Sequence, residues 1–179
     1  EEKTKELGKI DDFTDEQKNE LFHTIGLGAL KFFVLRVNPF KKIIFNPEES
    51  IDFHGFTGPF IQYTHARIRA ILRRAAAVTT EDYEALKDYT LSAEEKEVII
   101  QLGQYENTLR VAAEKYDPSE MANYCYTLAK TFNKFYHEKP ILTAATEREK
   151  KLRVALTAET GRLLAKGMKL LGIEVPERM

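Results

Sequence analysis

The spacing of apolar residues along the chain predicts amphipathic helices almost throughout. In five segments, aliphatic and aromatic residues recur every three or four positions, which places them on one face of an α-helix. The segments are residues 15–37, 59–74, 93–116, 118–139 and 147–171. No repeat, low-complexity tract or polar linker separates them. We therefore expect an all-α fold, in which the helices pack as one up-and-down bundle with little strand.

Capping residues support these helix boundaries. Residues 14–17 and 92–95 fit the capping-box pattern, in which Ser or Thr is followed three positions later by Glu or Gln. Residues 57–59 and 117–118 place a capping Thr or Asp shortly before a proline, which the first helical turn accepts because an N–H there has no partner. Gly172 is the expected cap at the end of the last helix.

Shorter elements are expected between the long helices. The pattern predicts a small extended turn at residues 46–49, a short helix over residues 79–86, and one unbroken helix over residues 93–116. We interpret residues 1–55 as a helical lead-in, or connector, and residues 56–179 as the helical domain itself. The chain does not open with Met, which suggests a piece of a longer protein.

Composition places the chain among soluble globular proteins. Hydrophobic residues make up 43% of it, and no apolar run approaches the ~20 residues that a membrane span needs, so we expect no membrane association. Cys125 is the only cysteine, which excludes an intramolecular disulfide and favours a cytoplasmic location.

Charge is distributed unevenly. The net charge is −1, which argues against a general electrostatic binder of nucleic acid. Residues 1–20 hold eight acids against four lysines and residues 81–97 hold seven acids against two lysines, so both segments would repel phosphates. Positive charge gathers within residues 67–74 and residues 130–153. A nucleic acid would therefore meet a local basic patch.

One helical face combines flat rings with guanidinium groups. At about 100° per residue, two rings and two arginines fall within an arc of roughly 60°. These residues are Phe60, Tyr63, Arg67 and Arg74. Such a face suits stacked bases and phosphates. Alternatively, the rings belong to the core and the arginines are solvated surface, and the spacing alone favours this second interpretation.

Signatures of enzyme chemistry are mostly missing. The four His residues form no zinc-binding pattern, and only one of them has a Glu three positions before it, so we expect no metal site. No serine lies in a nucleophile elbow, and no glycine-rich loop could cradle phosphates. We therefore expect no catalytic residue in this chain.

A family resemblance changes the balance between these interpretations. Residues 57–69 read Thr-Gly-Pro-Phe-Ile-Gln-Tyr-Thr-His-Ala-Arg-Ile-Arg, which resembles the signature at the first helix of the anticodon-binding domain of arginyl-tRNA synthetases. Residues 26–33, residues 45–53 and the last ten residues are also similar to that family. The resemblance implies the helical anticodon-binding domain of a class I synthetase, the DALR type. Residues 150–153 read Lys-Lys-Leu-Arg where the naming motif stands, so only the Arg and an apolar neighbour agree.

The resemblance also implies site residues. Carried over position by position, the residues that would contact the anticodon are Phe60, Tyr63, Arg67, Tyr136 and Met179. Basic residues expected to contact the phosphate backbone are Arg74, Lys134 and Lys139.

The implied function is recognition of tRNA(Arg) by one part of an arginine–tRNA ligase. The parent enzyme would attach arginine to the tRNA in its own N-terminal catalytic domain, with ATP and Mg²⁺. This chain lacks the ATP-binding segments of class I synthetases, so we expect no cofactor in it. We also expect a monomer. The alternative, from a different functional class, is a non-catalytic helical protein-interaction bundle whose Arg-rich face binds an acidic partner.

Overall fold

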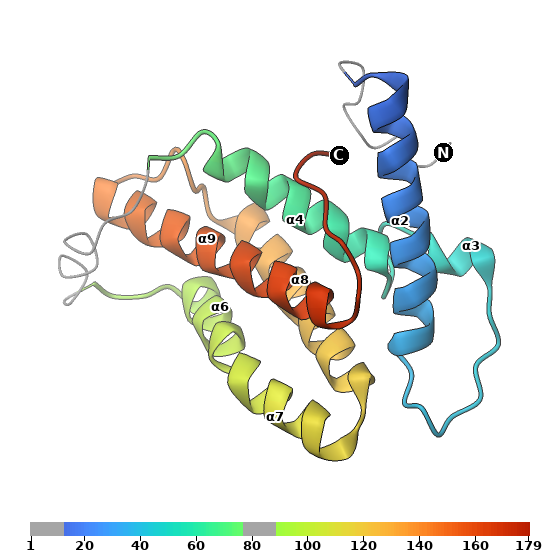
Figure 1. Ribbon diagram of the computed structural model, residues 1–179. Helices are drawn as coiled ribbons and strands as arrows, with labels where there is room; N and C mark the ends of the chain where they lie inside the picture. Colours follow the sequence, from blue (N-terminus) through green and yellow to red (C-terminus); the bar gives the residue numbers. More distant parts are fainter. Residues whose placement is uncertain (1–12, 77–88) are drawn as a thin grey trace.

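The computed structural model describes residues 13–76 and 89–179, and every regular element in these ranges is a helix (Figure 1). The helices are α2 (Asp15–Leu35), α3 (Pro47–Ser50), α4 (Gly58–Leu72), α6 (Ala93–Gly103), α7 (Tyr105–Lys115), α8 (Pro118–Glu138) and α9 (Glu147–Leu170). The all-α prediction is therefore confirmed over this part of the chain. The helix predicted at residues 79–86 lies outside the described residues.

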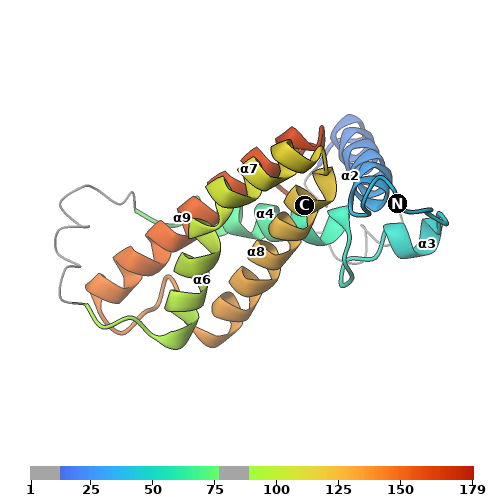
Figure 2. The same ribbon diagram turned by 90° about the horizontal axis from the view of Figure 1, so that it is seen from below.

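Helix α8 is the centre of the bundle. It packs against α4, α6, α7 and α9, while α2 stands across one end of the bundle and packs mainly on α4 (Figures 1 and 2). Fully buried side chains fill the space between these helices, and the largest of them are Phe32, Phe132, Phe135, Ile61, Ile68, Leu128, Leu164 and Met168. No helix of the described residues has both the length and the apolar character required to cross a bilayer.

The predicted helix starts are confirmed. The side chains of Thr14 and Ser92 each accept a hydrogen bond from the backbone N–H three residues later, and both complete a capping box. Thr57 caps α4 by accepting from the N–H of Phe60, and Asp117 caps α8 by accepting from the N–H of Ser119, each with a proline in the first turn. Helix α9 ends just before Gly172, whose φ of 68° is the left-handed conformation that lets the chain turn back.

Two predicted elements differ in the structure. The expected extended turn at residues 46–49 is instead the single helical turn α3, because the side chain of Asn46 accepts hydrogen bonds from two successive backbone N–H groups. The helix predicted over residues 93–116 breaks at Gln104, which separates α6 from α7. Gly103 precedes the break, and glycine disfavours a helix interior by about 1 kcal/mol relative to alanine. The break lets both shorter helices pack against α8.

Two glycines set the crossing of α2 over α4. A Cβ atom at Gly58 would lie 2.8 Å from the carbonyl oxygen of Gly28, and one at Gly28 would lie 2.5 Å from Nε2 of Gln62. Neither position has room for a larger residue. Gly28, which weakens α2 as an isolated helix, therefore permits the close contact of α2 with α4.

Arg153, which lies in the second basic segment of the sequence, is buried and not part of an exposed positive patch. Its Nε donates to Oε1 of Glu95 at 2.8 Å, and Glu95 itself is fully buried. The same guanidinium donates to the carbonyl of Pro140 at 2.9 Å and contacts Glu149 at 3.3 Å. Arg153 thus fastens the start of α6 and the loop before α9 to α9 itself.

Candidate nucleic-acid interface

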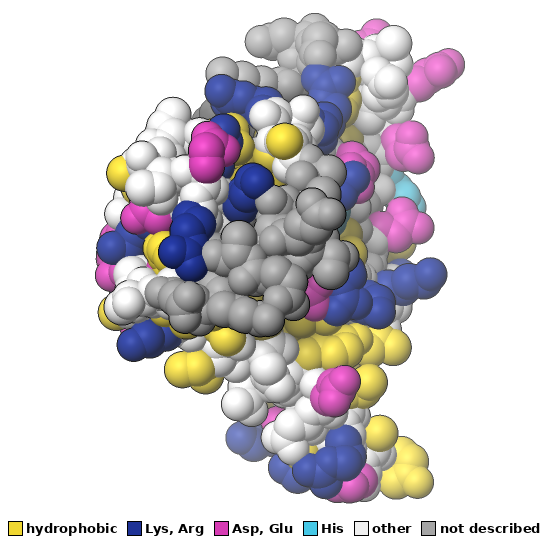
Figure 3. Space-filling model, turned by 90° about the vertical axis from the view of Figure 1, so that its left-hand side faces the viewer, with side chains coloured by type: hydrophobic (Ala, Val, Ile, Leu, Met, Phe, Trp, Pro, Cys, Tyr) yellow, Lys and Arg dark blue, Asp and Glu magenta, His cyan; other side chains and the backbone are white. Residues whose placement is uncertain are grey.

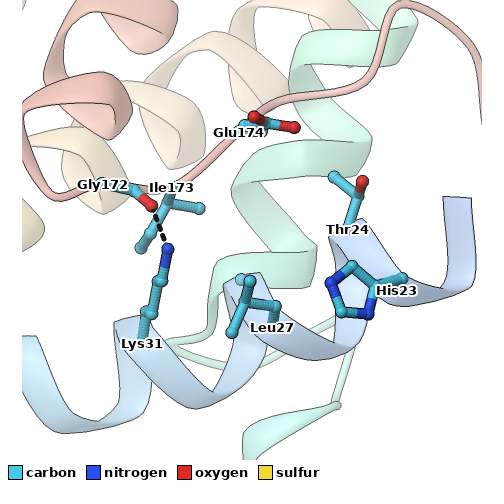
Figure 4. A pocket seen from close by; sticks show the side chains of 8 residues that line it. His23, Thr24, Leu27, Lys31, Gly172, Ile173 and Glu174 are labelled. Carbon is cyan, nitrogen blue, oxygen red and sulfur yellow. Dashed lines mark hydrogen bonds between the residues drawn. The ribbon is translucent and has the colours of Figure 1, made fainter. Parts of the chain in front are cut away.

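The last eight residues form a tail that runs back along α4, next to α2 (Figure 1). Side chains of α2 and α4 hold its backbone by hydrogen bonds. Lys31 of α2 donates to the carbonyl of Gly172 at 2.6 Å, a bond that Figure 4 shows beside a small pocket between α2 and the tail. From α4, Gln62 donates to the carbonyl of Glu174 at 2.8 Å, and Nδ1 of His65 lies 3.0 Å from the carbonyl of Pro176.

An open hollow of about 470 Å³ lies where α4, α8 and the tail meet. Its lining residues are Tyr63, Ala66, Arg67, Ala70, Arg73, Tyr136, Arg178 and Met179. Four of the five predicted anticodon contacts are therefore brought together, although they come from three separate segments of the chain. Met179 also packs with Tyr63 against the small apolar cluster of Leu21, Ile25 and Phe53.

Arg67 lies between the two tyrosine rings of the hollow. Its guanidinium carbon is 4.8 Å from the ring centroid of Tyr63 and 5.1 Å from that of Tyr136. Such cation–π contacts contribute about 0.5–1 kcal/mol each at exposed sites. One side chain of α4 thus orients a ring on its own helix and a ring on α8.

A chain of hydrogen bonds fixes the guanidinium of Arg67. Its NH1 donates to Oδ1 of Asn133, Nδ2 of Asn133 donates to the hydroxyl of Thr64 at 2.8 Å, and that hydroxyl donates to the carbonyl of Phe60 at 2.8 Å. Each donor faces an acceptor only in this orientation of the Asn133 side-chain amide. Among the described residues the hydrogen bonds of Arg67 use NH1, so its other guanidinium nitrogens can donate into the hollow.

Phe60 is the predicted contact that does not line this hollow. Its ring centroid lies 5.3 Å from that of Tyr126 on α8, and the side chain packs against the edge of the main core. Its backbone carbonyl nevertheless ends the hydrogen-bond chain that holds Arg67. The ring of Phe60 therefore packs against the core and Tyr126. Its predicted contact with an anticodon stays a prediction.

The three predicted phosphate contacts also lie outside the hollow. Lys134 of α8 and Lys139 just after it form ion pairs at 3.0 Å with Glu97 and Glu94, respectively, while Arg74 is exposed beyond the end of α4. A phosphate would have to compete with these carboxylates for the two lysines. Their predicted contacts with RNA remain predictions.

The basic segment 67–74 is less free than the sequence indicates. Nε of Arg69 contacts a carboxylate oxygen of Glu177 at 2.6 Å, and Arg73 donates to the backbone carbonyl of the same residue at 3.0 Å. On the face shown in Figure 3, Lys and Arg side chains are interspersed with Asp and Glu side chains. The positive field around the hollow is therefore local.

Several residues of the hollow were not predicted. Ala66 and Ala70 stand between Tyr63 and Arg73 at helical spacing, and their small side chains leave the floor of the hollow open. That spacing of small residues between a ring and an arginine is a signal visible in the sequence. Asn133 had no such signal, because its role depends on how α8 lies against α4.

Comparison with known proteins places this geometry in a family. The family model of the DALR anticodon binding domain matches residues 61–179, which is more than half of the chain. The chain belongs to the DALR anticodon-binding domain family. This match starts on α4 and includes every residue that lines the hollow of the DALR domain.

Relatives of this DALR domain are parts of longer enzymes. An arginine–tRNA ligase of Bacteroides fragilis is 47% identical over 179 residues, which cover 99% of this chain and 30% of that protein. An arginine–tRNA ligase of Flavobacterium psychrophilum is 44% identical over 176 residues, 98% of this chain and 29% of that protein. The chain therefore spans about 30% of the length of the ligases it matches.

Solved structures show the same fold. An arginyl-tRNA synthetase of Thermus thermophilus superposes with a TM-score of 0.85 at 32% identity, over 96% of this chain and 29% of that one. One of Plasmodium falciparum superposes with a TM-score of 0.77 at 24% identity, over 89% and 28% of the two chains, and supports the fold alone. The predicted fold of a class I synthetase anticodon-binding domain is thus confirmed.

Proposed function

We propose that this DALR domain recognises the anticodon of tRNA(Arg) as part of an arginine–tRNA ligase. One observation supports this most strongly: Tyr63, Arg67, Tyr136 and Met179, from α4, α8 and the tail, surround one open hollow. The hollow offers flat rings, a cation and an apolar edge, which together suit an unstacked base and its phosphate. The relatives are named as arginine–tRNA ligases, and these names support arginine as the amino acid of the tRNA.

The middle base of the anticodon is the one we expect the hollow to read. Every arginine codon has G at its centre, so every arginine tRNA carries C at the middle of its anticodon. A splayed C could stack on Tyr63 or Tyr136 and present its amino group to a backbone carbonyl, which a uracil carbonyl would repel. The free donors of Arg67 could reach O2 of the base or its phosphate, and Met179 would close the apolar side.

Binding of an anticodon stem-loop of tRNA(Arg) by the 179-residue chain tests this proposal. Affinity should fall steeply with added salt, because Lys and Arg side chains would displace counterions from the phosphates. A stem-loop of equal length from a tRNA with another middle base is the control. Salt-insensitive binding, or equal affinity for both stem-loops, would favour the helical protein-interaction bundle instead.

The catalytic chemistry of the parent enzyme is assigned to its other domain. Among the described residues no three His, Cys, Asp or Glu side chains gather as a metal site, and the sequence has no glycine-rich phosphate loop. These observations support our expectation that ATP and Mg²⁺ bind in another part of the parent ligase. We expect the purified chain to show no arginine-dependent exchange of pyrophosphate into ATP, and we infer that it works in the cytoplasm as part of a monomeric ligase.

An exposed apolar surface on the lead-in supports attachment to that catalytic domain. It comprises exposed apolar residues of α2 and of the loop after it, namely Leu27, Leu30, Val34, Phe40, Ile43, Ile44 and Phe45. Phe40 and Ile44 are 92% and 91% exposed. Contiguous apolar surface on a protein usually marks an interaction site. In the parent ligase we expect this face to pack against the catalytic domain.

A further inference from the structure

The fully buried Gln62 ties three segments of the chain together. Its Nε2 donates to the carbonyl of Thr24 on α2 at 3.2 Å and to the carbonyl of Glu174 in the tail at 2.8 Å. The oxygen of the amide could not face these two carbonyls, so the hydrogen bonds assign its orientation. Both N–H groups of the amide are therefore used to hold the tail at the crossing of α2 and α4.

His65 holds the tail one helical turn further on. Only 4% of His65 is exposed, and this burial lowers the pKa of its imidazole, so the ring is neutral at neutral pH. A neutral ring carries one proton, and Nδ1 must carry it to donate to the carbonyl of Pro176 at 3.0 Å. His65 thus acts as a single fixed donor for the backbone of the tail.

Arg69 and Arg73 extend this row along the same side of α4. Arg69 contacts the carboxylate of Glu177, and Arg73 donates to the backbone carbonyl of Glu177. Directly after Glu177 come Arg178 and Met179, which line the hollow. Residues at positions 62, 65, 69 and 73 therefore contact Glu174, Pro176 and Glu177 of the tail, in that order, as it approaches the hollow.

We propose that Gln62 and His65 are positioning residues, which hold the tail along α4 and thereby place Met179 and Arg178 at the edge of the hollow. This inference rests on the proposed function, since the hollow is taken as the site that reads the anticodon. Gln62 and His65 of α4 thus act on the backbone of the tail, whereas Tyr63 and Arg67 of the same helix are the residues that contact RNA.

The methyl groups of methionine allow the position of the tail to be measured without RNA. The chain has three Met residues, and two of them, Met121 and Met168, are 3% and 0% exposed in the core. In a ¹³C-methyl spectrum these two report whether the bundle is intact, and Met179, which lines the hollow together with Tyr63, reports the tail. His65→Leu and Gln62→Leu should move the Met179 signal toward that of a free methionine and leave the other two in place.

Matched variants separate a lost hydrogen bond from general disruption. His65→Asn keeps an N–H donor close to the place of Nδ1, so it should restore the Met179 signal. His54→Leu removes an exposed imidazole that has no contact with the tail, and should change none of the three signals. Arg69→Gln, at an exposed ion pair, cannot disrupt the core and should shift Met179 in the same direction by a smaller amount.

Affinity for the anticodon stem-loop of tRNA(Arg) provides the second readout. Loss of one hydrogen bond to the tail should weaken binding about three- to tenfold, and His65→Asn should recover most of it. If the Met179 signal stays in place in both His65→Leu and Arg69→Gln, the inference is overturned, whatever the RNA does. It is also overturned if Met179 moves while affinity is unchanged. If Met179 moves but the unaltered chain binds no tRNA(Arg), the proposed function fails and the tail contacts stand.

Discussion

The two sides of the hollow are built in different ways. Tyr63, Arg67 and Tyr136 stand on α4 and α8, whose opposite faces lie in the main core, so these side chains are placed by the packing of the whole bundle. Arg178 and Met179 stand on a tail without regular structure, which is held by side-chain hydrogen bonds to its backbone and by the buried Ile173. The positions of the side chains on the helical side should therefore change only when the packing of the bundle changes. The position of the tail should instead change after single polar substitutions.

The largest expected effect concerns the bundle that supports the helical side. Arg153→Met should lower the free energy of unfolding by about 3–5 kcal/mol, because it leaves the buried carboxylate of Glu95 without its cationic partner. Arg110→Met is the control: its pair with Glu114 is exposed, and such pairs contribute no more than about 1 kcal/mol. Urea denaturation measures both. Equal losses would show that the helical side does not depend on the buried pair.

The next largest effect concerns binding, and it comes from a residue on the helical side of the hollow. Arg67→Ala should weaken binding of tRNA(Arg) by about 1–3 kcal/mol, since it removes a cation from the hollow and releases the rings of Tyr63 and Tyr136. Arg67→Lys keeps the charge but loses the planar group that lies between the rings, and should recover only part of the affinity. Titration of a labelled stem-loop measures these values, and full recovery by lysine would contradict the role given to the guanidinium plane.

The smallest effect concerns the tail side and its response to pH. Because burial holds the pKa of His65 below its usual value of 6.5, the folded chain resists protonation of this ring more than the unfolded chain does. The neutral His65 ring therefore makes its full contribution to the free energy of unfolding above about pH 6.5. This contribution is lost as the pH falls toward the lowered pKa. His65→Asn should remove this part of the pH dependence in thermal unfolding between pH 7 and pH 5. An unchanged slope would show that the buried ring does not contribute to it.

Local patterns in the sequence were enough to predict most of the helix starts, whereas the site residues were predicted from the family resemblance. Capping residues such as Thr14 and Ser92 act within their own turn, and Tyr63 and Arg67 share a face by spacing alone. The contact of Gln62 with Glu174 joins residues far apart in the chain, so no local pattern encodes it. The same reason explains why Arg69 was interpreted as part of a free basic face before its pair with Glu177 was seen.

The break at Gln104 was missed because the apolar spacing continues across it. Capping signals mark the start of α6 but not of α7, which begins without a side-chain cap. Gly103 alone is a weak signal, since single glycines occur within helices. Packing of both α6 and α7 on α8 decides the geometry there, and this packing depends on the whole bundle.

The measurement that tests the central claim most directly is binding of two forms of the tRNA(Arg) anticodon stem-loop, one with C and one with U at the middle position. Binding is compared in the unaltered chain and in Met179→Ala, which alters one edge of the hollow. We predict that the change from C to U weakens binding by about 1–3 kcal/mol, and that Met179→Ala weakens binding of the C form more than that of the U form. If neither change matters, while substitution of the first anticodon base does, the hollow between Tyr63, Arg67, Tyr136 and Met179 is not the site that reads the anticodon.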